Sequence, residues 1–209
     1  MQKIAADFRK YHIAVEQFKS NYEYLPGDLP TASSYWSGMT GNGDGDGRIC
    51  LGIEYYYAWE QLGSNGSGLL PGKYTVAAPT ALSEYNHPYT GLRDIFFGFY
   101  TTDPFCTLET LFGVAGPNAI SLFSRTGVNN YAWSYGALSA RDAKMLDTKI
   151  DDGIANLGRL FGVDAANAPA TSACSTAAAS AGANYNISGT YASDNRGCRL
   201  FSFIEKSKP

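Results

Sequence analysis

The first 22 residues carry apolar side chains at alternating intervals of four and three positions. Side chains with this spacing lie on one face of an α-helix. No Gly or Pro interrupts the pattern before Pro26 and Gly27, so we predict a single helix of about 20 residues that buries this face. The apolar positions, called the seam below, are Ile4, Phe8, Tyr11, Val15, Phe18 and Tyr22.

Downstream patterns predict two shorter helices and an antiparallel sheet. One helix is expected from Ile53 to Leu62, ended by Gly63, and another is expected to be capped by Ser139 and to continue to Ile150. Stretches rich in aromatic or β-branched residues predict strands at 95–101, 119–124, 130–135 and 199–205. We therefore predict an α+β fold: a long N-terminal helix packed on an antiparallel β-sheet, with short extra helices and long loops.

Composition and charge narrow the class of protein. The 209 residues include 16 Lys and Arg against 19 Asp and Glu, and the basic residues are scattered, so we expect no nucleic-acid partner. Charged residues make up 17% of the chain, against about 25% in typical globular proteins. This low charge, with 23 Gly and 15 Tyr, favours a protein outside the cytosol with long ordered loops. No apolar run approaches the ~18 residues that indicate a membrane-spanning helix.

The four cysteines are Cys50, Cys106, Cys174 and Cys198. They show no CxxC spacing, and only two histidines are present, which argues against a zinc site. An even number of cysteines favours two disulfides in an oxidising compartment, and three pairings are possible. We favour Cys174–Cys198, because it closes a segment rich in Ser, Ala, Gly and Asn.

The glycine-rich loop at 41–49 has the spacing of a calcium loop. Asn42, Asp44 and Asp46 occupy positions one, three and five, and Gly47 follows at position six. Oxygen ligands two residues apart in a tight loop point towards one centre, and the backbone carbonyl of Arg48 is a candidate fourth ligand. The bidentate Glu expected at position twelve is absent, since Glu54 stands one position late. Another segment must then complete the site: Asp28, Asp151 and Asp152 are candidates, and a metal-free turn is the alternative.

Catalytic chemistry has little support in this sequence. Asp151 and Asp152 are adjacent at a predicted helix end, and adjacent side chains on a helix point in different directions. His12 lies one position off the seam, which favours a solvated or intersubunit role, and His87 precedes a Pro in a loop. No G-x-S-x-G, H-E-x-x-H or Walker lysine motif is present. We expect no catalytic residues and no enzymatic activity.

Aromatic residues are concentrated in two predicted elements. Tyr55, Tyr56, Tyr57 and Trp59 fall within one helix, and strand 95–101 has four more aromatic residues. We expect most of them to lie in the core. An exposed subset could stack on sugars, so a calcium-dependent adhesin or lectin-like domain is an alternative function, and an aromatic patch beside the metal loop would favour it.

Four motifs, taken in order, resemble the bacterial type IV pilins and type II secretion pseudopilins, which are made as prepilins. They are Tyr22–Asp28 (YEYLPGD), Asn42–Gly47 (NGDGDG), Ala58–Leu62 (AWEQL) and Ala143–Gly153 (AKMLDTKIDDG). The resemblance is strong over 11–62 and 138–158, thin over 64–137 and absent over 164–197.

The resemblance implies a pilin-type fold and a structural, non-enzymatic role. It implies that residues 1–24 are the C-terminal half of the pilin helix and that 25–209 form the head. Prepilins begin with a basic leader and a hydrophobic helix half, neither of which is present here, so we expect that this sequence lacks that part. The missing half would anchor the precursor in the inner membrane, and the helix would then contact copies of itself or sister pilins. We expect an extracytoplasmic subunit, in the periplasm or in a filament on the cell surface.

Overall fold

The computed structural model describes residues 1–50, 53–76, 87–92, 94–101, 118–124, 135–165, 173–176, 182–188 and 196–204. These residues form a mixed fold with four helices and one antiparallel sheet of four strands. The elements are α1 (Gln2–Tyr22), α2 (Ala32–Tyr35), α3 (Glu54–Leu62), β1 (Ile95–Thr101), β2 (Asn118–Ser124), α4 (Ala140–Ile150), β3 (Leu160–Asp164) and β4 (Cys198–Phe203).

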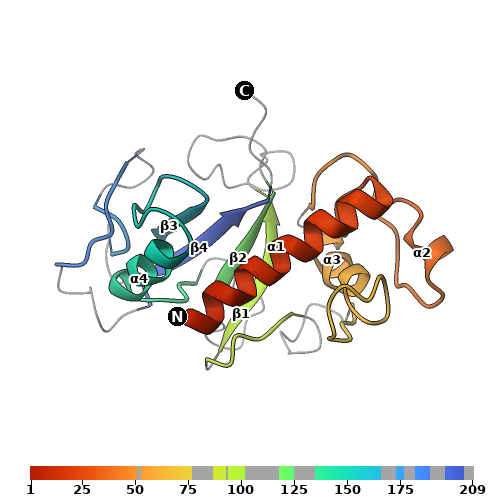
Figure 1. Ribbon diagram of the computed structural model, residues 1–209, viewed down its shortest axis with the longest axis horizontal. Helices are drawn as coiled ribbons and strands as arrows, with labels where there is room; N and C mark the ends of the chain where they lie inside the picture. Colours follow the sequence, from red (N-terminus) through yellow and green to blue (C-terminus); the bar gives the residue numbers. More distant parts are fainter. Residues whose placement is uncertain are drawn as a thin grey trace.

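Helix α1 buries the seam that its sequence predicts. Five of the six seam residues are buried, and Tyr22 at the C-terminal end is half-buried. In Figure 1, α1 runs across the sheet with α4 beside its N-terminal half and α3 beside its C-terminal half. The helix ends at Glu23, which adopts a left-handed conformation (φ 65°) while its N–H donates to the Lys19 carbonyl. No helix among the described residues is long and apolar enough to cross a membrane.

The sheet has the strand order β1-β2-β4-β3, and every neighbouring pair is antiparallel. Alternate residues on each strand face the helices, as the pleat of a strand requires. On β1, Phe97 and Phe99 belong to the main core: the Phe97 ring lies 5.0 Å from Phe8 of α1, and the Phe99 ring lies 4.5 Å from Trp59 of α3. The aromatic residues of α3 and β1 are all buried, so core packing accounts for both groups.

The structure confirms the coarse α+β prediction and most element boundaries. Helix α3 begins one residue later than predicted, and α4 is capped by Ser139, whose Oγ accepts from the Asp142 N–H. Strand β3 was not predicted; its sequence, Leu-Phe-Gly-Val-Asp, is short and has Gly at its centre. The strand expected at 130–135 lies almost wholly outside the described residues.

Candidate metal centre

Three carboxylates from two segments meet at the surface of the helical layer. Asp28, Asp44 and Asp46 each offer an oxygen, and these atoms all lie within 4.8 Å of one another. Asp44 and Asp46 are exposed on the glycine-rich loop, whereas Asp28 is only 1% exposed. The arrangement, called the loop cluster below, could hold a metal ion.

Close backbone packing brings Asp28 beneath the loop. The Gly43 N–H donates to the Leu29 carbonyl at 3.0 Å, and a side chain at Gly43 would collide with the backbone of Asp28. The turn that carries Asp28 is in turn held on α3, because the Gly27 N–H donates to Gln61 Oε1 at 2.7 Å. Glycine at 27 and 43 therefore positions the buried carboxylate under the two exposed ones.

Both ends of the loop are tied to regular structure. Thr40 donates from its N–H and its hydroxyl to the carboxylate of Glu60 on α3, at 3.1 and 2.8 Å. At the other end, Asn118 of β2 accepts from the Ile49 N–H at 2.9 Å and donates to the Gly47 carbonyl at 3.0 Å. The loop is thus clamped between α3 and the sheet, which keeps its carboxylates in place.

Asp28 has an oxygen that lacks a partner. Its Oδ2 accepts from the Gly47 N–H at 3.0 Å, but within the described part of the chain no hydrogen-bond partner reaches its buried Oδ1. Burial raises the pKa of Asp28 to about 7. The backbone N–H groups of Gly47 and Gly45 act in the opposite direction, and the nearby carboxylates of Glu54 and Asp46 add to the rise. Buried polar oxygens normally have a partner, so this one requires an explanation, and a bound cation would supply it.

Glu54 supports the loop cluster from the first turn of α3. Its Oε1 accepts from the Asp44 N–H at 3.1 Å, and its Oε2 accepts from the Cys50 N–H at 2.9 Å. Burial raises its pKa, while these two N–H groups act in the opposite direction. Glu54, which stands one position late for a calcium loop, therefore closes the loop by accepting hydrogen bonds from the loop's backbone.

Asn42 and Arg48, the other two predicted ligands, form hydrogen bonds or ion pairs with neighbouring residues. Asn42 Oδ1 accepts from the Ser33 N–H of α2 at 2.8 Å, which ties the start of the loop to that helix. The Arg48 guanidinium pairs with Asp46 Oδ2 at 3.0 Å, and the Arg48 N–H donates to Asp46 Oδ1 at 2.9 Å. Asp28, which the sequence offered as one of three candidates, is the one that joins Asp44 and Asp46.

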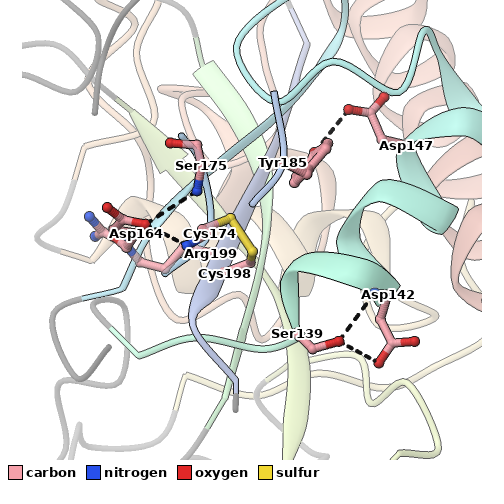
Figure 2. Close-up of a disulfide and its surroundings, with 9 residues drawn as sticks. All are labelled: Ser139, Asp142, Asp147, Asp164, Cys174, Ser175, Tyr185, Cys198 and Arg199. Atoms are coloured by element: carbon pink, nitrogen blue, oxygen red, sulfur yellow. Dashed lines mark hydrogen bonds between the residues drawn. A yellow bond between two sulfur atoms is a disulfide. The ribbon is translucent and has the colours of Figure 1, made fainter. Parts of the chain in front are cut away.

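A second group of carboxylates lies at the end of α4. Asp147, Asp151 and Asp152, called the α4 cluster below, also offer oxygens within 4.8 Å of one another. Here each residue accepts hydrogen bonds: the Tyr185 hydroxyl donates to Asp147 at 2.9 Å, as Figure 2 shows, and the Ile154 N–H donates to Asp152 at 2.8 Å. Burial raises the pKa of Asp147 to about 7.

Backbone N–H groups complete the α4 cluster. The Gly153 N–H donates to Asp147 Oδ1 at 3.2 Å, and Asp151 Oδ2 accepts from the backbone of Arg159 and Leu160. Asp151 and Asp152, which the sequence offered as further calcium ligands, therefore cluster with Asp147, whereas Asp28 clusters with the loop.

Two exposed tyrosines precede the loop in the sequence, and one of them contacts it. Tyr35 is 58% exposed and Tyr24 is 36% exposed, and the ring of Tyr35 lies 5.3 Å from Tyr22 and 5.6 Å from Trp36. Tyr24 lies against the loop, since a Cβ at Gly45 would come within 3.2 Å of its ring. These four aromatic residues are called the aromatic patch below.

The disulfide between Cys174 and Cys198 is the pairing that the sequence favoured, with Cα atoms 4.8 Å apart. Figure 2 shows it with Tyr185, which pairs with Ser175 next to Cys174 and points towards Asp147. Cys50 is also disulfide-bonded, and Cys106 lies outside the described residues.

His12 and His87 both contact other residues of the same chain. His12 Nε2 lies 2.7 Å from Ser202 Oγ of β4, so its position next to the seam brings it to the sheet. His87 is fully buried, and its ring lies 5.4 Å from Tyr56 and 5.6 Å from Phe123.

Comparison of the chain with protein-family models, with curated proteins and with solved structures gave no match.

Proposed function

We propose that this chain is a non-enzymatic structural subunit of an extracytoplasmic filament or secretion pseudopilus, with a pilin-type fold and a calcium ion in the loop cluster. The observation that carries the proposal is the arrangement of α1, which packs one face on an antiparallel sheet and leaves a second face open. Ile13 on that open face is 58% exposed. The order of the four pilin-like motifs gives the same interpretation.

The loop cluster supports calcium in particular. Its three carboxylates come from a glycine-rich loop and one buried position, and calcium accepts such irregular sets of hard oxygen ligands. Magnesium requires a compact octahedron and retains its water, so it suits this arrangement less well. A calcium ion would also give Asp28 Oδ1 the partner that no described residue provides.

The filament role is tested by fusing the chain behind the leader and apolar helix half of an established prepilin. Expressed with a prepilin peptidase, the fusion should be cleaved, should associate with the membrane, and should cross-link to other copies through α1. Ile13→Asp should abolish cross-linking and leave the melting temperature unchanged. Met145→Asp, at a 45% exposed position on α4, is the matched control. Absence of cleavage would refute the prepilin interpretation.

Calcium binding is tested separately with terbium, a luminescent ion that takes the same oxygen ligands. Terbium bound at Asp28, Asp44 and Asp46 should be sensitised by Tyr24 and displaced by calcium. Asp28→Asn should abolish the signal, Tyr24→Phe should weaken the signal but preserve binding, and Asp152→Asn should change neither. Equal signals from wild type and Asp28→Asn would exclude the loop cluster as the binding site.

The aromatic patch favours a second candidate function, a calcium-dependent adhesin or lectin-like domain. Sugars stack their C–H faces on exposed aromatic rings. Tyr24 and Tyr35 present such rings, and Tyr24 lies against the loop of the candidate calcium site. The test is binding to an array of glycans in calcium and in chelator. Tyr35→Ala should remove calcium-dependent binding, whereas Tyr89→Ala, at another partly exposed tyrosine, should not.

A further inference from the structure

A cavity of about 540 Å³ lies where α1 passes the end of α4 and the strands β3 and β4. Its volume falls in the range of about 300–1,000 Å³ that is typical of small-molecule sites. Apolar side chains from two helices, Phe8, Ile13 and Ile150, form part of its wall. A molecule with an apolar body would be desolvated against these groups.

Two guanidinium groups line the same cavity. Arg9 donates to the Lys149 carbonyl at 2.7 Å, which fixes its position and leaves its other N–H groups available. Arg159 is held through its backbone by Asp151 and Phe203, and within the described chain no partner is recorded for its side chain. Glu16 is the only carboxylate among the lining residues, so two cationic charges and one anionic charge leave a net charge of +1 in a protein of net charge −3.

A polar pair also lines the cavity. His12 and Ser202 share a hydrogen bond of 2.7 Å between Nε2 and Oγ, and both residues line the cavity. Burial and the neighbouring charge of Arg159 lower the pKa of His12 to about 4, so the imidazole is neutral at pH 7. The pair therefore offers hydrogen-bonding capacity without adding charge.

We propose that this cavity binds a small free carboxylate that carries an aliphatic or aromatic body, with the carboxylate at Arg9 and Arg159 and the body against Phe8, Ile13 and Ile150. Guanidinium groups match the planar geometry of a carboxylate. A single negative charge neutralises the net charge of +1 on the lining, whereas a phosphate dianion would leave the filled site with a net charge of −1. The proposal does not rest on the filament role or on the calcium site.

The test is a titration of the folded protein at pH 7.5, followed by NMR of its backbone amides. The probes are octanoate, octanamide and acetate: the amide keeps the chain without the charge, and acetate keeps the charge without the chain. Octanoate should shift amides at Ile13, Ile150 and Ser202. Octanamide should bind at least about tenfold more weakly, because it loses the charge-assisted hydrogen bonds, and acetate should show no saturable binding.

Two variants test where the carboxylate of octanoate binds. Arg159→Gln should weaken octanoate binding about tenfold, and the fold should be retained, since only the backbone of Arg159 takes part in recorded hydrogen bonds. Arg141→Gln, at an exposed position on α4 outside the cavity, should leave the affinity unchanged. Three results would each overturn the proposal: equal affinities for octanoate and octanamide, shifts confined to other surfaces, or an Arg159→Gln variant that binds like wild type.

Discussion

The loop cluster and the α4 cluster each contain three carboxylates whose oxygens lie within 4.8 Å of one another, but they differ in their hydrogen-bond donors. In the α4 cluster all three acids accept hydrogen bonds, and the buried Asp147 accepts on both oxygens, from the Gly153 N–H and the Tyr185 hydroxyl. In the loop cluster, Asp28 Oδ1 is buried and lacks a recorded donor among the described residues. The buried acid of the α4 cluster therefore has a donor on each oxygen, whereas the buried acid of the loop cluster has one oxygen that a cation could contact.

This difference shows that a count of acidic residues does not identify a metal site. Two carboxylates held 4 Å apart repel one another by roughly 4 kcal/mol at an effective dielectric constant of 20. A protein can offset that repulsion with donors or with a cation. The predictions below test this contrast, in order of decreasing expected effect.

The largest effect is expected from the disulfide that holds Tyr185 near Asp147. Cys174→Ser combined with Cys198→Ser opens a loop with a sequence separation of 24, which should cost about 3–4 kcal/mol of unfolding free energy. Denaturant unfolding measures this loss. Amide exchange at Gly153 should accelerate as Asp147 loses Tyr185, while the calcium response should remain. Unchanged exchange at Gly153 would show that the disulfide does not support the α4 cluster.

The next effect concerns pH and Asp147. Its pKa in the folded state is about 7, above the ordinary value of 3.8, so between these values the folded state keeps a proton that the unfolded state releases. Stability should therefore fall as pH rises from about 4 to 7, by on the order of 2 kcal/mol. Asp28 has a pKa of about 7 as well, so Asp147→Asn should reduce the slope of this part of the profile without abolishing it, measured by unfolding in chelator. The control is Asp152→Asn, and identical slopes for wild type and Asp147→Asn would contradict the prediction.

Calcium should stabilise the protein through the loop cluster alone. At tenfold excess over the dissociation constant the gain is about 1.4 kcal/mol, visible as a higher melting temperature than in chelator or magnesium. Asp28→Asn should have two opposite consequences: loss of the calcium gain, and a higher melting temperature in chelator, because a neutral amide replaces a buried carboxyl group that has one oxygen without a partner. Glu16→Gln, at an exposed position, should behave like wild type. A full calcium response in Asp28→Asn would mean that Asp28 is not a ligand.

The smallest effect is the part of the cost of a glycine substitution in the loop that calcium offsets. Gly47 has φ of +83°, and a Cβ there would meet nothing within 4 Å, so Gly47→Ala should cost only the ~1–2 kcal/mol of a left-handed alanine. Bound calcium should offset part of this loss by holding the loop. Gly38→Ala, with φ of +90° and equally open space, is a matched control whose loss calcium should not offset. Equal calcium effects on both variants would show that bound calcium does not stabilise the conformation of the loop.

Much of the fold could be predicted from local pattern. The four-three spacing identified α1 and its buried face, because helix periodicity is a property of neighbouring residues. The Ser139 cap identified α4 for the same reason. Strand β3 was missed because it is short, has Gly at its centre, and belongs to the sheet only through its pairing with β4.

The candidate site was predictable only in part. Asp44 and Asp46 follow from their two-residue spacing in one loop. Asp28 could not be ranked against Asp151 and Asp152, because its place depends on the close approach of Gly43 to the Asp28 backbone, which has no local signature. Glu54 failed the twelfth-position rule and still closes the loop, through hydrogen bonds that spacing does not encode.

The position of β4 has a consequence for how the chain reaches its native state during biosynthesis. This strand, Cys198–Phe203, lies between β2 and β3, and its Ser202 also bonds to His12 of α1, 190 residues earlier. The β1–β2 pair and strand β3 cannot join into one sheet until β4 has emerged from the ribosome. The nascent chain therefore lacks a complete sheet until residues 198–203 have been synthesised.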